Sequence, residues 1–191
     1  YHVADAGSPE LSQEIKDVLA KSENIGYYQY TYQNTESARY TANYYVKGNK
    51  IKIHYGLLQR YNNFAYFDVY LDRAKGLAYL VCDDKSYCKG LWIKEVMFDE
   101  FNVETPLDAV AYIDNGEKIE DSEWDSKKAI VVLYVNNAGN SEKVWLWTYR
   151  GLPLKREITS GGIKTTITYN SLVVNTPEEV SVEVPEGLEM V

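Results

Sequence analysis

The chain is poor in the residues that most metal and catalytic sites use. It contains 2 His and 2 Cys in 191 residues, whereas a structural zinc site needs four ligands. His54 has no serine or cysteine motif around it, which favours a surface or packed histidine over a catalytic base. The Gly161-Gly162 pair joins two predicted strands and opens no helix, so it is no phosphate-binding loop. We therefore expect no catalytic residues, no metal and no cofactor.

Positive charge is also in short supply. Lys and Arg number 20 against 28 Asp and Glu, which gives a net charge of −8 and a pI near 4.9. Binding to phosphates needs clustered Lys and Arg, so this balance argues against a nucleic-acid partner. It argues equally against attachment to anionic lipid headgroups through a basic patch. No apolar run is long enough to cross a bilayer.

The acidic residues form short clusters that match no cation site. Solvated loops account for them, because they lack the carboxylate spacing of a calcium loop. A carboxylate pair for glycoside cleavage stays open, because a sequence does not give the distance between two carboxyl groups in space. The clusters are Asp83-Asp84, Asp99-Glu100 and Glu120-Asp121-Ser122-Glu123.

Tyrosine, by contrast, is abundant. The chain has 18 Tyr against 4 Phe and 4 Trp. Tyrosine combines a large apolar ring with a polar tip, so it suits strands that are exposed at one end and cavities lined with hydroxyl groups. One interpretation is a strand-rich protein that uses Tyr as a two-faced strand former, and the other is a specific ligand site.

The two cysteines predict a short disulfide-closed hairpin. Cys82 and Cys88 bracket a turn-like run between the segments Leu77–Val81 and Leu91–Glu95. If these segments pair, the cysteines lie opposite each other at bridging distance, and a bridge would stabilise the fold by about 2 kcal/mol on the loop-entropy model. Free thiols are the alternative. A disulfide indicates an oxidising compartment.

The start of the chain fits such a compartment. The first residue is Tyr1 and not methionine. A removed signal peptide or an anchor ahead of Tyr1 would explain this, and so would a trimmed cytosolic chain. With the predicted disulfide, we expect an extracytoplasmic protein of the periplasm or cell surface, associated with the membrane only through an anchor N-terminal to Tyr1.

Capping signals and apolar spacing predict two helices. Residues 1–7 are small and polar and predict a tether. Ser8-Pro9-Glu10 then predicts a helix start, with Ser as N-cap and Pro at the first helical position. Thr105-Pro106-Leu107-Asp108 predicts a second, short helix that ends at Asn115-Gly116. The predicted apolar stripes are Leu11, Ile15, Val18 and Leu19 in the first helix, and Leu107, Val110 and Ala111 in the second.

The rest of the chain predicts strands linked by hairpins. Lys47-Gly48-Asn49-Lys50 and Ser160-Gly161-Gly162 are hairpin turns between alternating segments. Residues 117–128 are polar and acidic and predict a loop. An order of helix, hairpins, helix and hairpins favours an antiparallel sheet, which curls when it is long. We expect one α+β domain over residues 8–191, in which two helices cover the concave face of a curved antiparallel sheet, an incomplete β-barrel.

Alternation also predicts which side chains line the covered face. Tyr28, Tyr30 and Tyr32 share a face of one strand, and Trp145 and Trp147 share a face of another. These side chains either fill an ordinary core or line a cavity for an acyl chain or a similar apolar ligand. The residues that we expect to line such a cavity are Tyr28, Tyr30, Tyr32, Tyr44, Phe67, Val69, Trp145, Trp147 and Ile167.

The C-terminal part of the chain resembles the ending of LolA-like proteins, a superfamily that includes periplasmic lipoprotein carriers and related envelope lipoproteins. The motifs are Trp145–Lys155, Gly161, Thr168-Tyr169-Asn170 and Val184-Pro185-Glu186-Gly187. The resemblance implies an incomplete antiparallel barrel whose concave apolar face, lidded by helices, receives lipid chains. No arginine here matches the one that latches the lid in the carriers, and the unplaced candidates are Arg39, Arg60 and Arg73.

Two functions follow as hypotheses. The first is a non-catalytic extracytoplasmic protein that binds a lipid or acyl chain between the sheet and its helices, in lipoprotein or lipid handling at the cell envelope. The second is a cell-surface interaction or sensor module with a filled core, whose exposed tyrosines contact an envelope protein. They differ in internal volume, because a ligand pocket of roughly 300 Å³ or more is needed for binding.

Overall fold

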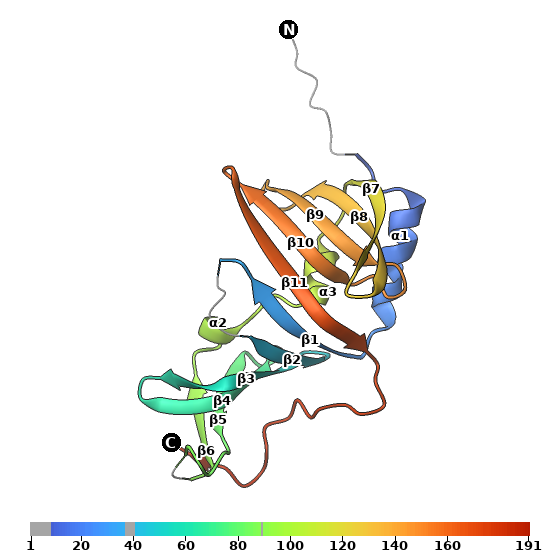
Figure 1. Cartoon of the computed structure of the whole chain (residues 1–191). Helices are drawn as coiled ribbons and strands as arrows, with labels where there is room; N and C mark the ends of the chain where they lie inside the picture. The colour runs from blue at the N-terminus through green and yellow to red at the C-terminus, as the bar shows by residue number, and fades with distance from the viewer. Residues whose placement is uncertain (1–8, 37–40, 89) are drawn as a thin grey trace. The chain divides into compact units, whose positions relative to one another are not determined.

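The computed structural model describes residues 9–36, 41–88 and 90–191 (Figure 1). The predicted tether over residues 1–7, the predicted N-cap Ser8 and the candidate Arg39 lie outside these ranges. The chain divides into two compact units, and the expectation of one domain over residues 8–191 stays a prediction. Unit 1 comprises Tyr1–Asn24, Asn34–Glu36 and Glu104–Tyr169, and unit 2 comprises Ile25–Gln33, Ser37–Val103 and Asn170–Val191.

Short helices and many strands make up the described part of the chain. The helices are α1 (Gln13–Ala20), α2 (Phe98–Phe101) and α3 (Pro106–Ala111), with a 3-10 turn, η1 (Lys21–Asn24), after α1. The strands are β1 (Tyr27–Asn34), β2 (Ala42–Lys47), β3 (Lys50–Tyr61), β4 (Phe64–Asp72), β5 (Leu77–Cys82), β6 (Trp92–Val96), β7 (Glu117–Trp124), β8 (Lys127–Val135), β9 (Ser141–Trp147), β10 (Pro153–Ser160), β11 (Ile163–Val174) and β12 (Glu189–Met190).

The sheet is open and almost entirely antiparallel, as the succession of hairpins predicts. In unit 1 the strands follow the order β11-β10-β9-β8-β7, and in unit 2 the order is β12-β6-β5-β4-β3-β2-β1. β12, which pairs with β6, is the parallel exception. Both predicted hairpin turns are confirmed, since Lys47 pairs with Lys50 and Ser160 pairs with Ile163.

The core of unit 1 forms where α1 and α3 pack against β8 and β9. Ile15 and Val18 of α1 join Val110 and Ile113, from α3 and the turn after it, in one buried cluster. Leu11 and Leu19 pack against that cluster, so the apolar stripe predicted for the first helix is confirmed. The strand residues of the cluster are Ile130, Val132 and Tyr134 of β8 and Val144 and Leu146 of β9.

The first helix begins later than the sequence predicts. Ser12 is the N-cap of α1, and its hydroxyl accepts a hydrogen bond from the Ile15 amide. The predicted start at Ser8-Pro9-Glu10 is wrong, because the stretch before Ser12 pairs with a distant segment. The Pro9 carbonyl accepts from the Gly116 amide at 2.8 Å, and Glu10 forms an antiparallel bridge with Asn115.

The second predicted helix starts where its capping signals place it. Thr105 and Asp108 form a reciprocal capping box, with Pro106 at the start of α3. The helix ends at Ala111, well before the predicted stop at Asn115-Gly116. Its buried residues are Pro106, Ala109 and Val110, whereas Ala111 of the predicted stripe is exposed.

One predicted loop is a strand. Residues 117–124 form β7, which pairs with β8 from Glu117–Leu133 to Trp124–Lys127. β7 ends the strand order of unit 1, so one of its edges has no neighbouring strand in that order. Polar side chains are common on such an edge because they discourage pairing with other chains. The polar sequence therefore marks an edge strand and not a loop.

Candidate functional site

Tyrosine rings lie side by side on one face of unit 2, where strand alternation predicts them. Tyr30 lies directly opposite Tyr44 in the β1–β2 register, and their ring centroids are 5.1 Å apart with an angle of 11° between the planes. Tyr28 stacks on Tyr30 at 6.1 Å, and Tyr32 tilts against Tyr44 at 5.8 Å. Stacked and tilted pairs of this kind stabilise by about 1 kcal/mol each beyond their burial.

Aliphatic side chains continue this face across the next strands. Tyr44 pairs with Ile53 of β3, Ile53 pairs with Val69 of β4, and Val69 pairs with Leu80 of β5. Because directly paired residues point to the same side of a sheet, these side chains and the tyrosines form one surface, here called the tyrosine face. Its residues are Tyr28, Tyr30, Tyr32, Tyr44, Ile53, Val69 and Leu80.

The hydroxyl groups of the buried tyrosines stay protonated at neutral pH. Burial raises the pKa of Tyr44 well above its ordinary value, with further contributions from Tyr55 and Tyr32. Burial also raises the pKa of Tyr66 to about 12. Tyr66 makes edge-to-face contacts with Tyr55 and with Phe101 of α2. These rings therefore offer uncharged surface with neutral hydroxyls, which is compatible with an apolar ligand.

Phe67 lies close to the disulfide turn of unit 2. Cys82 and Cys88 form the predicted disulfide, with their Cα atoms 6.1 Å apart. Cys82 ends β5 and pairs with Trp92, so Cys88 lies in the turn and not directly across the ladder. The Phe67 ring meets the ring of Tyr87 from that turn at 5.5 Å. This predicted lining residue thus contacts the disulfide turn.

In unit 1 the predicted lining residues lie on two different faces. Val144 and Leu146 belong to the cluster around α1 and α3, so Trp145 and Trp147, which alternate with them, lie on the opposite face of β9. Ile167 pairs with Arg156 and is buried. The structure does not bring the two tryptophans together with Ile167.

The tryptophan side chains of unit 1 hold lysines over their rings. The Lys155 ammonium lies 4.2 Å from the ring centroid of Trp145 and 4.8 Å from that of Trp124. Lys127 lies 5.5 Å from the ring of Trp147. Lys155 also pairs with Glu157 at 2.7 Å. The half-buried tryptophans of this face are thus in cation–π contact with lysines.

A buried ion pair in unit 1 is the feature that sequence reasoning missed. Arg156 and Glu142 are 5% and 0% exposed. Arg156 donates through Nε and Nη2 to the two Glu142 oxygens, at 2.5 and 3.2 Å, and through Nη1 to the Tyr169 hydroxyl at 3.3 Å. It also pairs with Glu104, which precedes α3. Burial alone would lower the pKa of Arg156, but the bond to Glu142 and the neighbouring charges raise it above its ordinary value.

The remaining arginine candidates lie in unit 2. Arg73 donates to the Asn102 side chain at 3.2 Å and to the Val103 carbonyl at 2.5 Å, so it fastens the segment that follows α2. Arg60 is exposed near the end of β3. Neither position matches Arg156, whose charge lies inside unit 1.

The sequence contained a signal for the buried ion pair. Glu142 and Arg156 occupy inward-facing positions of β9 and β10, where the other inward residues, such as Val144 and Leu154, are apolar.

His54 is fixed by a buried carboxylate. Its Nδ1 lies 2.7 Å from an Asp68 oxygen, and the Lys52 ammonium lies 3.5 Å from the other Asp68 oxygen. Asp68 is 3% exposed and alternates with Val69 of the tyrosine face, so this cluster occupies the other face of β3 and β4. The prediction of a surface or packed histidine agrees with this geometry, because the His54 side chain is 42% exposed and its ring contacts Asp68.

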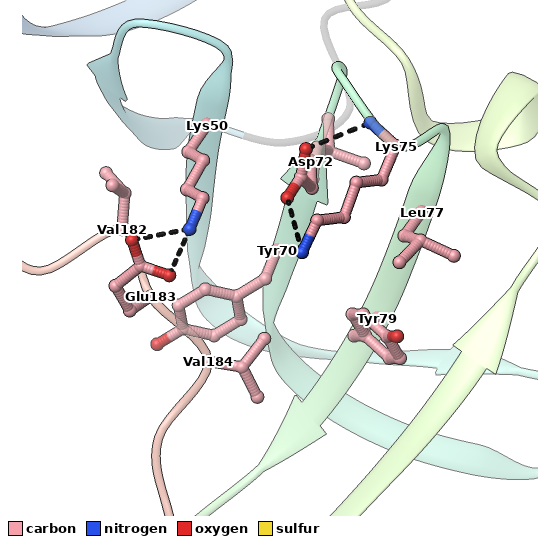
Figure 2. A pocket seen from close by; sticks show the side chains of 10 residues that line it. Lys50, Tyr70, Asp72, Lys75, Leu77, Tyr79, Val182, Glu183 and Val184 are labelled. Carbon is pink, nitrogen blue, oxygen red and sulfur yellow. Dashed lines mark hydrogen bonds and ion pairs between the residues drawn. The ribbon is translucent and has the colours of Figure 1, made fainter.

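The same side of unit 2 carries a pocket beneath the C-terminal segment, residues 176–191. Its volume is about 210 Å³, and its walls come from β3, β4 and β5 and from that segment. Figure 2 shows the Lys50–Glu183 and Asp72–Lys75 ion pairs on two sides of the Tyr70 side chain. The other lining residues are Leu71, Leu77, Tyr79, Val182 and Val184.

The C-terminal segment is held to unit 2 along its length. The Val180 amide donates to the Tyr27 hydroxyl at 3.1 Å, and Glu179 pairs with Lys47. Val184 and Leu188 pack against the buried cluster of Tyr70, Val81 and Ile93. At the end, the Glu189 and Val191 amides donate to the Leu91 and Ile93 carbonyls at 2.9 and 3.0 Å, and Figure 1 shows the segment running from the end of β11 to β6. The C-terminal segment, which covers the pocket, is therefore held in place by hydrogen bonds and an ion pair.

A second pocket in unit 2 is a wide surface groove. Its volume is about 610 Å³, and it is lined by residues from the ends of β3 and β6 and from the start of α2. None of the predicted lining residues borders either pocket. Within the residues that the structure describes, no group of three or more His, Cys, Asp or Glu side chains is placed to hold a metal, and no helix is long and apolar enough to span a membrane.

Comparison with solved structures defines the fold class. The structure of LprF from Mycobacterium bovis is similar at a TM-score of 0.57 and 13% identity, with 95% of this chain and 100% of that chain covered. MucB is similar at a TM-score of 0.52 and 12% identity, with 91% of this chain and 62% of MucB covered. Both likenesses establish a shared fold and nothing more. Sequence identities this low carry no information about activity.

Solved structures that are similar to this chain also include a protein of the LolA superfamily, the superfamily that the C-terminal motifs resemble. A LolA superfamily protein from Nitrosomonas europaea is among the similar structures, at a TM-score of 0.32 and 8% identity, with 86% of this chain and 94% of that chain covered. A score this low supports no argument about function. No family model and no curated protein matches the sequence.

Proposed function

We propose that this protein is a non-catalytic extracytoplasmic binding protein for a lipid or another apolar ligand, active in lipoprotein or lipid handling at the cell envelope. In this proposal helices cover the concave face of a curved antiparallel sheet, an incomplete barrel, and the ligand lies between the sheet and its helices. The tyrosine face carries the proposal. On this face, four tyrosines of β1 and β2 adjoin aliphatic side chains of β3, β4 and β5, because the residues pair directly from strand to strand.

The chemistry of the tyrosine face supports an apolar ligand. A raised pKa keeps the Tyr44 hydroxyl neutral, so no charge on this side chain opposes an acyl chain. The predicted lining residues Phe67 and Ile167 stay candidates in this proposal, whereas Trp145 and Trp147 lie on the face of β9 opposite to the one that packs against α1 and α3. The disulfide between Cys82 and Cys88 supports an oxidising, extracytoplasmic location, either the periplasm or the cell surface.

The decisive experiment is native mass spectrometry of the purified protein, followed by solvent extraction and lipid analysis. We expect a stoichiometric lipid that is lost on extraction and restored by added lipid. A mass without ligand, together with no thermal shift across a lipid panel, would contradict the proposal.

A matched pair of variants ties the ligand to the tyrosine face. Tyr32 is half-buried on this face, and Thr31 next to it points to the other side of β1. Tyr32→Asp places a charge against the ligand and should lower lipid occupancy at least tenfold. Thr31→Asp should leave occupancy unchanged, and equal losses from both variants would assign the effect to folding.

An interaction or sensor module is the second candidate function. Tyr149 is 67% exposed, and the Arg150 guanidinium lies 4.5 Å from its ring. Tyrosine and arginine are enriched among the residues that dominate protein–protein binding. An envelope protein is the partner that this hypothesis implies. Retained binding of such a partner by a lipid-free protein, and its loss on Tyr149→Ala, would favour this function.

A further inference from the structure

The pocket beneath the C-terminal segment combines an apolar body with opposite charges at its rim. Tyr70, Tyr79, Leu77 and Val184 supply rings and aliphatic groups, and Figure 2 shows Tyr70 between the two ion pairs and Leu77 and Tyr79 on the other side of Lys75. The lining contains two ammonium groups and two carboxylates, so its formal charge is zero. A neutral pocket with separated charges is complementary to a ligand that carries both charges itself.

The two ion pairs at the rim differ in the distance between their charged groups. Lys50 contacts both oxygens of Glu183, at 2.6 and 2.5 Å, and joins the C-terminal segment to β3. The Lys75 ammonium is 3.9 Å from the nearer Asp72 oxygen, which is beyond hydrogen-bonding distance. The first pair is therefore a wall of the pocket, whereas the second pair can open to a ligand at little cost.

Asp72 and Lys75 are placed to bind groups of opposite charge. The Lys75 side chain is 71% exposed, so its ammonium can turn toward a ligand carboxylate. The Asp72 side chain is 17% exposed, and one of its oxygens accepts from the Lys75 amide at 3.1 Å, which fixes the carboxylate in the β4–β5 turn. Asp72 can thus accept hydrogen bonds from a ligand ammonium through its other oxygen.

We propose that this pocket binds a small zwitterion with an apolar body, a free α-amino acid with an aliphatic or aromatic side chain. Its ammonium lies on Asp72, its carboxylate on Lys75, and its side chain between Tyr70, Tyr79 and Val184. A volume of about 210 Å³ equals that of about seven molecules of liquid water, which suits a single amino acid and not a lipid. The site lies on the opposite side of β4 from Val69 of the tyrosine face and does not depend on the proposed lipid site.

Isothermal titration calorimetry of the whole chain with leucine and three analogues tests the proposal. Leucinamide lacks the carboxylate, N-acetylleucine lacks the ammonium, and alanine lacks the apolar body. We expect leucine or phenylalanine to bind with a Kd at or below about 1 mM, which is about 4 kcal/mol of binding free energy. Each analogue should bind at least tenfold more weakly.

Variants assign the two charges. Asp72→Asn keeps an oxygen for the Lys75 amide and removes the charge, and Lys75→Met keeps the length of the side chain. Each should weaken leucine binding at least tenfold. Lys85→Met, at an exposed position of the disulfide turn, is the matched control and should leave binding unchanged.

Three results would overturn the proposal. They are absence of leucine and phenylalanine binding at about 10 mM, equal binding of leucine and leucinamide, and full binding by the Lys75→Met variant. Lipid occupancy measured on the same preparations separates this site from the proposed lipid site. Loss of amino-acid binding in Asp72→Asn with unchanged lipid content is the expected combination.

Discussion

Arg156 and Glu142 form a buried, bidentate ion pair in unit 1, with hydrogen bonds of 2.5 and 3.2 Å. Neither side chain has appreciable contact with solvent. Charges buried in this way need their partners, because removal of one leaves the other without compensation in a medium of low dielectric constant. Stable folding of unit 1 therefore requires that both charges of the pair are present or that both are absent.

Glu142→Leu should destabilise the protein by about 3–5 kcal/mol, because the Arg156 charge loses its main partner while it stays buried. Urea unfolding followed by circular dichroism measures the loss. The double variant Glu142→Leu/Arg156→Met should recover much of it, since both charges are then gone. A single variant as stable as the parent would contradict this account of the pair.

The buried tyrosines predict a loss of stability at high pH. The folded-state pKa of Tyr66 is raised to about 12, whereas an unfolded tyrosine titrates near 10. Below pH 10 both states hold the proton, so stability does not depend on this group. Above pH 10 the unfolded state releases the proton first, and stability falls by about 1.4 kcal/mol per pH unit until the folded state titrates as well.

Tyr66→Phe should therefore flatten the decline of stability between pH 10 and 12, because phenylalanine has no proton to release. Urea midpoints measured from pH 8 to 12 report the difference. Tyr149→Phe, which removes the hydroxyl of a tyrosine that is 67% exposed, is the control variant. The same slope in the parent and in Tyr66→Phe would be evidence against a raised pKa at this position.

The disulfide should contribute modestly to stability. The bridge between Cys82 and Cys88 closes a short loop, for which the loop-entropy model gives about 2 kcal/mol. Cys88→Ser with Cys82→Ser should lower the urea midpoint accordingly, and a reductant should lower the parent to the same value. A reductant that also shifts the double variant would show an effect unrelated to the bridge.

Local signals predicted the parts of the fold that depend on neighbours in the sequence. The capping box of Thr105 and Asp108 and the hairpin turn after Lys47 are confirmed, because each is formed within a few residues. The start of α1 was misassigned between Ser8 and Ser12. The choice depends on Pro9, whose carbonyl bonds to Gly116, more than a hundred positions away. Such a contact leaves no trace in the local pattern.

The candidate site was predictable in part for the same reason. Alternation groups Tyr28 with Tyr30 on β1, and the register then adds Tyr44. Alternation also groups Trp145 with Trp147, but it does not tell which face of β9 the helices cover. The pocket could not be predicted, because Val184 joins Tyr70 through a C-terminal segment that has almost no regular structure.

Gly151, in the corner between β9 and β10, should tolerate no side chain. Its φ is +70°, and an added Cβ would lie 2.3 Å from the Val18 carbonyl oxygen of α1. Gly151→Ala should therefore destabilise the protein by at least about 1 kcal/mol from the backbone conformation alone, and by more because α1 must move away. Gly161→Ala is the matched control, since Gly161 has a φ of +56° but open space around it. Thermal unfolding of both variants separates strain from collision: a larger loss for Gly151→Ala is expected, and equal losses would show that α1 yields freely at this corner.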